Sequence, residues 1–123
     1  MYKNKIEDFR AKYPRIAKMT VAEVVNSDEF SGIDSVIDKN MQLLYNHKNA
    51  FHSLLKNGYF EKEIFKKEYI ACLDKESKLS SIKRAIILFI GNEVYNRTIA
   101  KMMDSYDAIQ SEEATENLEK LSL

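Results

Sequence analysis

The sequence predicts an all-α fold: a compact bundle of four to six helices in a single domain spanning residues 1–123. The chain has only three glycines and one proline, too few turn residues for a sandwich or barrel of many short strands. Apolar residues recur at helical spacing over long stretches. The hydrophobic fraction of 45% and charged fraction of 31% are typical of a globular protein. The long helices are predicted at about 33–57, 60–76 and 81–110.

Two short helices are predicted in the N-terminal third. Ile6, Phe9 and Tyr13 fall at helical spacing before a proline, which cannot continue the hydrogen-bond ladder. Thr20 and Glu23 have the spacing of a capping box, in which each side chain bonds the backbone N–H of the other. A second helix is therefore expected to begin at Thr20.

The helix predicted over 33–57 has the clearest periodicity. Its main apolar stripe has alternating spacings of four and three residues and comprises Ile37, Met41, Leu44, Lys48, Phe51 and Leu55. We expect Leu44 and Phe51 to lie at the centre of the core. Asn57 and Gly58 then supply the left-handed conformation with which many helices end.

The last long helix, over 81–110, is predicted to have two parts. Residues 82–90 are almost all apolar, which predicts burial on every side. Beyond Gly91 the pattern narrows to a stripe with the spacing of a coiled coil, which we call the seam. The seam comprises Asn92, Tyr95, Ile99, Met102, Tyr106 and Ile109. Residues 111–123 form an acidic, weakly amphipathic segment that either frays or docks.

Charge is balanced over the whole chain but not along it. The formal net charge is zero, which argues against a surface built throughout to attract nucleic acid or anionic membrane. Residues 1–19 nevertheless carry six basic and two acidic side chains, and residues 104–123 carry six acidic and one basic side chain. The two ends can attract each other within one fold or between two copies.

The residue types of common catalytic and metal sites are sparse. His47 and His52 are five residues apart, which places them on different faces of a regular helix and disfavours a shared metal. The lone Cys72 lies on an apolar helical face and is expected to pack as a small hydrophobe. With no disulfide framework and no apolar stretch long enough to span a bilayer, we expect a cytoplasmic protein with no membrane partner.

Carboxylate pairs and phosphate-binding motifs give no stronger indication of a catalytic or metal site. Asp34 and Asp38 share a helix face, as do Glu112 and Glu116, but surface charge explains such pairs better than a cation site. The sequence lacks a P-loop, a G-x-G-x-x-G run and a nucleophile elbow. We therefore expect no enzyme, no cofactor and no metal, with a helical enzyme using a carboxylate site as a minor alternative.

Two segments resemble half of a helix-turn-helix. Residues 98–106 resemble the first helix and turn, but Asp104 stands where the turn glycine is usual and an acidic segment follows. Residues 20–26 have a similar sequence pattern and follow a basic segment, but they lead into a longer loop than this motif allows.

These observations favour a non-enzymatic helical module for protein–protein interaction, such as an adaptor, a small inhibitor or a secretion-type chaperone. The seam residues are its predicted partner-binding site, and a homodimer in which Asn92 fixes the register is the simplest form of self-association. The alternative explanation of the seam is that the 33–55 face covers it within one chain. The alternative function is a small DNA-binding transcriptional regulator. Its predicted contacts are the basic N-terminal residues Lys3, Lys5, Arg10, Lys12, Arg15 and Lys18.

Overall fold

The computed structural model of the chain describes residue 11, residues 19–30 and residues 32–122, with side chains described up to residue 105. All the regular secondary structure in this part of the chain is α-helical, which confirms the predicted all-α fold. The described helices are α3 (Val21–Val25), α4 (Ile33–Lys39), α5 (Met41–Tyr45), α6 (Lys48–Lys56), α7 (Lys62–Leu73) and α8 (Ser81–Ser122).

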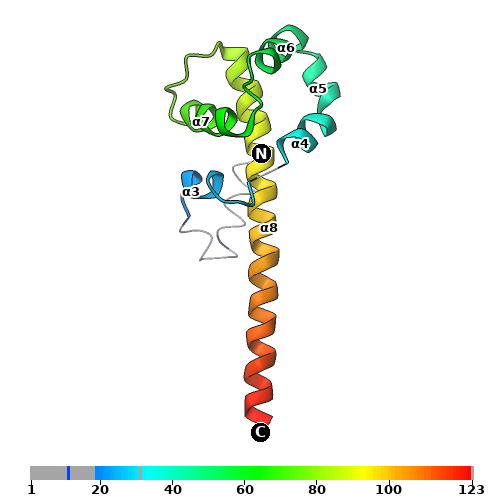
Figure 1. The fold of residues 1–123 in the computed structure, drawn as a ribbon, viewed down its shortest axis with the longest axis vertical. Coiled ribbons are helices and arrows are strands. Elements are labelled where there is room, and N and C mark those ends of the chain that lie inside the picture. Colours follow the sequence, from blue (N-terminus) through cyan, green and yellow to red (C-terminus); the bar gives the residue numbers. More distant parts are fainter. Residues whose placement is uncertain (1–10, 12–18, 31, 123) are drawn as a thin grey trace.

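Helix α8 is the central element of the fold. Its 42 residues span about 63 Å at 1.5 Å per residue. Helices α3, α4, α6 and α7 contact it, and they gather around its N-terminal half, while its C-terminal half extends beyond them (Figure 1). The predicted end near residue 110 is wrong, because the helix continues to Ser122. Residues 111–122 contain no glycine or proline, and eight of these twelve residues are Glu, Leu, Ala or Lys, which favour a helix.

The single helix predicted over 33–57 is divided into three. The first break is at Asn40, whose side-chain Nδ2 donates to the Val36 carbonyl at 2.9 Å. The second break is at Asn46 and His47. Asn side chains compete for backbone hydrogen bonds in this way, so they end helices readily. Helices α4, α5 and α6 consequently form an arc beside the N-terminal half of α8 (Figure 1).

The break alters which residues of the main stripe are covered. Leu44 and Phe51 are 3% and 5% exposed, so their predicted burial is confirmed. Met41 and Leu55, from the same stripe, are 39% and 50% exposed. Because the three short helices point in different directions, one continuous stripe in the sequence faces the core at some positions and the surface at others.

Helix α3 begins with one half of the predicted capping box, the bond to Thr20. Thr20 has extended backbone angles, and its hydroxyl oxygen accepts a hydrogen bond from the Glu23 N–H at 3.2 Å. Val24 and Val25 then bury their side chains completely. The capping interaction thus sets the start of a helix whose apolar end joins the core.

Helices α6 and α7 end in the same left-handed geometry. After α6, Gly58 has a φ of 74°, as predicted, and the Tyr59 N–H donates to the Leu54 carbonyl at 3.0 Å. After α7, Lys75 takes that position with a φ of 62°, and the Glu76 N–H donates to the Ala71 carbonyl at 2.9 Å. These are the bonds of a Schellman motif, which supplies partners for carbonyls at a helix end.

The core follows one side of α8, where Ile87, Ile90 and Val94 are fully buried. The predicted burial of 82–90 on every side is wrong at its start, since Ile82 is 52% exposed and Ala85 is exposed as well. The described helices cover this first part of α8 on some sides only.

Candidate protein-interaction surface

The predicted seam divides into a covered part and a part beyond the described side chains. Tyr95 and Ile99 are each 1% exposed and belong to the core of a single chain. Met102 is partly buried against the same core. The side chains of Tyr106 and Ile109 lie outside the described residues. In this structure a partner could not reach Tyr95 and Ile99 without displacing other parts of the same chain.

Asn92, the polar residue of the seam, has a partner within its own chain. The Tyr69 hydroxyl on α7 donates a hydrogen bond to Asn92 Oδ1 at 2.7 Å. Burial raises the pKa of Tyr69 well above its ordinary value, and the proximity of Tyr95 raises it further, so the phenol stays protonated and remains a donor. Asn92 therefore ties α8 to α7.

A groove opens between α5 and the N-terminal part of α8. It has a volume of about 350 Å³, and its lining is mostly apolar. We call it the α5–α8 groove; it is lined by Leu43, Leu44, Asn46, His47, Ala85, Ile86 and Phe89. Leu44 and Ile86 are 3% and 4% exposed and form its base, while Leu43 is 57% exposed at its edge.

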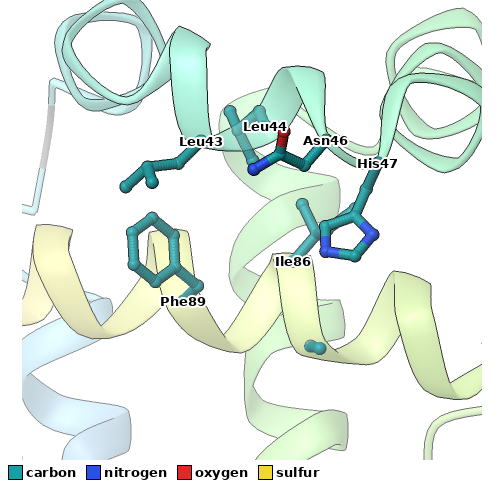
Figure 2. A pocket seen from close by; sticks show the side chains of 7 residues that line it. Leu43, Leu44, Asn46, His47, Ile86 and Phe89 are labelled. Carbon is teal, nitrogen blue, oxygen red and sulfur yellow. The ribbon is translucent and has the colours of Figure 1, made fainter.

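The side chains of this groove come from opposite walls. Figure 2 shows Leu43 facing the Phe89 ring at one end, and the His47 imidazole beside Ile86 at the other. An adjoining hollow is lined by Ile82 together with residues 46–50, and Ile82 is 52% exposed. Apolar surface thus continues along α8 from Phe89 back to Ile82, at the spacings that align residues on one helical face.

The sequence pattern did not indicate this groove. Leu43 is not part of the main stripe predicted over 33–57, and α5, which ends at Asn40 and Asn46, leaves it 57% exposed. Phe89 belongs to the segment 82–90, for which the sequence predicts burial on every side, and it is only partly buried. A signal was present in the sequence, since asparagine stands at both ends of this five-residue helix.

Metal ligands and the cysteine are the candidate chemical groups of the described residues. These residues contain no group of three or more His, Cys, Asp or Glu side chains that could hold a metal ion. Cys72 is 2% exposed, as expected for a packed thiol. Burial raises its pKa, with the nearby Glu68 adding to the effect against hydrogen bonds that lower it. A buried thiol with a raised pKa is a poor nucleophile.

Of the DNA-binding alternative, the structure describes the two helix-turn-helix-like segments but none of the basic residues. All six of these basic residues, from Lys3 to Lys18, lie outside the described residues. The helix-turn-helix interpretation of 98–106 is wrong, because this segment lies within the uninterrupted helix α8 and has no turn at Asp104. Residues 20–26 contain a helix of five residues, and the next helix begins only at Ile33.

Comparison of the chain with protein-family models, with curated proteins and with solved structures found no match. Among the described residues, no helix combines the length and apolar character needed to cross a bilayer.

Proposed function

We propose that this chain is a non-enzymatic helical module that binds a protein partner through the α5–α8 groove. The composition of the groove supports this proposal, because apolar side chains form its base and both walls and Leu43 remains 57% exposed at its edge. A concave apolar surface with a few polar groups at its margin is the usual form of a site that accepts an apolar anchor residue. An adaptor, a small inhibitor or a secretion-type chaperone is the kind of protein we propose.

The expected ligand is a segment that inserts a large apolar side chain between Leu43 and Phe89. Helical segments suit this geometry, since Ile82, Ala85 and Phe89 form an apolar line along α8 against which a second helix can lie. Asn46 and His47, at one end of the groove, offer hydrogen bonds that would fix the orientation of the ligand.

A displayed library of amphipathic helical peptides tests this proposal. Peptides selected on the wild-type chain should lose at least about tenfold in affinity for Leu43→Asp, because the charge would be desolvated by an apolar anchor. Tyr45→Asp is the matched control, since Tyr45 lies on the same helix, is 59% exposed and does not line the groove. If no selected peptide distinguishes the two variants, the α5–α8 groove is not the binding site.

We propose self-association as a second property, through the part of the seam beyond the core. Beyond Met102, which still packs against the core, Tyr106 and Ile109 continue the apolar spacing of the sequence. The C-terminal half of α8 extends past the other described helices (Figure 1). A homodimer would cover this part of the helix.

The DNA-binding alternative rests on the six basic residues among residues 1–19. Salt-dependent retention on random duplex DNA separates it from the protein-binding proposal, because phosphate contacts weaken steeply as salt rises. We propose a cytoplasmic location, for which the support is a single buried cysteine and no cysteine pair.

A further inference from the structure

A second groove lies among α4, α5, α6 and the turn that leads to α7. It has a volume of about 500 Å³ and is separate in its lining from the α5–α8 groove. We call it the acidic groove; it is lined by Asp34, Ile37, Asp38, Met41, Phe51, Leu55, Gly58, Phe60 and Glu61.

The floor of the acidic groove is apolar and its sides are accessible. Ile37, Phe51 and Phe60 are between 5% and 8% exposed, so each contributes only a small surface to the base. Met41 and Leu55 are 39% and 50% exposed. Met41 and Leu55 therefore expose much more apolar surface than the three residues of the floor, and a ligand in the groove would cover that surface.

Three carboxylates accompany this apolar surface. Asp34 and Asp38 are four residues apart on α4, so they lie on one face of that helix. Glu61 precedes α7, and its carboxylate lies close to Gly58, where an added Cβ would be 3.4 Å from Oε1. No basic side chain is among the nine residues that line the groove; Lys62 lines a neighbouring hollow.

We propose that the acidic groove binds a basic amphipathic helix of a partner protein. The apolar face of such a helix would cover Met41 and Leu55, and its flanking Lys or Arg side chains would pair with Asp34, Asp38 and Glu61. The same carboxylates repel phosphate groups, which makes nucleic acid and anionic lipid unsuitable occupants. They also repel the acidic end of α8 from a second copy of the chain.

Two synthetic helical peptides test the charge requirement directly. Both carry leucine at the same positions of one helical face; one has lysine at the flanking positions and the other has glutamate. In fluorescence anisotropy at low salt, the lysine peptide should bind at least about tenfold more tightly, and its affinity should fall as salt is added. Equal affinities for the two peptides, or no binding of the lysine peptide, would overturn the proposal.

Charge variants locate the site. Asp34→Asn/Asp38→Asn/Glu61→Gln should reduce the affinity of the lysine peptide about tenfold. The control Asp28→Asn/Asp74→Asn/Glu76→Gln removes the same charge at exposed positions outside the groove and should change the affinity less than about twofold. An equal loss in both triple variants would show a general effect of net charge and overturn the proposal.

Apolar variants separate this groove from the α5–α8 groove. Leu55→Ser should weaken the lysine peptide about tenfold, whereas Leu43→Ser should leave its affinity unchanged; both residues are at least half exposed, so neither change empties the core. The reverse pattern would reject the acidic groove as the binding site and leave the proposal for the α5–α8 groove intact.

Discussion

At the scale of single residues, Gly91 is where the Tyr69 ring of α7 lies directly against the backbone of α8. A Cβ at Gly91 would lie 2.0 Å from ring atom Cδ1, far inside van der Waals contact. Gly91→Ala should therefore lower the free energy of unfolding by about 1–3 kcal/mol, although alanine ordinarily favours a helix by about 1 kcal/mol. Urea denaturation measures the change.

The matched test for Gly91 removes the ring. In a Tyr69→Leu background the same Gly91→Ala substitution should cost less, because the clashing atoms are gone, and the double-mutant cycle gives the coupling between the two positions. A stabilising effect of Gly91→Ala in the wild-type background would show that α7 does not approach α8 in this way.

Tyr69 also predicts how stability depends on alkaline pH. Burial raises its pKa in the folded chain above the ordinary value of 10.0, so the unfolded chain loses this proton first as pH rises. The contribution of the protonated, buried Tyr69 to the free energy of unfolding is fully present below about pH 10 and is lost as pH rises above that value. Tyr69→Phe should flatten the decline in unfolding free energy above pH 10, and should cost about 1 kcal/mol at neutral pH through the lost bond to Asn92.

The exposed Tyr45 provides the comparison for this pH profile. Tyr45 is 59% exposed, so Tyr45→Phe removes a hydroxyl that is not buried. In this control, the decline of unfolding free energy at alkaline pH should equal that of the wild type. Burial also raises the pKa of Cys72 above 9.0, so some decline should persist in Tyr69→Phe. Identical slopes for wild type and Tyr69→Phe would contradict a buried, protonated Tyr69.

Lys75 occupies a backbone conformation that glycine adopts without strain. Its φ of 62° falls in the left-handed region, and its position after α7 matches that of Gly58 after α6. Lys75→Gly should raise the free energy of unfolding by about 1 kcal/mol, because the left-handed conformation is costly for residues with a Cβ. Lys75→Ala keeps the Cβ and should give no such gain in thermal denaturation; equal gains in both variants would exclude this explanation.

At the scale of elements, α3 depends on its cap because it has only five residues. Thr20→Ala removes the acceptor for the Glu23 N–H and should lower the free energy of unfolding by about 1 kcal/mol. Thr20→Ser retains a hydroxyl and should cost much less. The cap has no such role if the alanine and serine variants unfold at the same denaturant concentration.

Helix ends set by local chemistry could be predicted from the sequence, and bends set by packing could not. Thr20 and Gly58 act through hydrogen bonds to neighbouring backbone groups, so their roles follow from spacing alone. The breaks at Asn40 and Asn46 lie inside an apolar stripe that continues across them. Spacings of four and three residues can be satisfied by one straight helix or by three short ones around α8. The two asparagines permit a break, but the apolar spacing does not require one, so tertiary contacts decide between these arrangements.

At the scale of the whole molecule, the same reason limits prediction of the candidate site. Spacing identifies the seam, but spacing does not show that Tyr95 and Ile99 are already buried within a single chain. The α5–α8 groove joins Leu43 to Phe89, and two positions this far apart in the sequence are brought together only by the path of the chain. The periodicity of one helix shows its own apolar face, but it does not show a groove that forms between two helices.

The C-terminal half of α8 leads to the last prediction. Its length past residue 104 is close to that at which isolated helices are only marginally stable in water, and no other described helix lies beside it (Figure 1). Parallel pairing of two copies through Met102, Tyr106 and Ile109 would bring two acidic segments together, each with six acidic and one basic side chain over residues 104–123. Self-association should therefore strengthen as salt screens this repulsion, over about 0.01–0.3 M salt.

Sedimentation velocity across this range of salt measures the effect, with two variants that each add one negative charge. Ile109→Asp should abolish association at every salt concentration while the chain stays folded. Ser111→Asp should have little effect, because two residues place it roughly 200° around the helix from the seam. A chain that is monomeric throughout would reject the pairing. Association that weakens as salt is added would instead indicate attraction between the acidic end of one copy and the basic residues 1–19 of another, since screening opposes a contact between opposite charges.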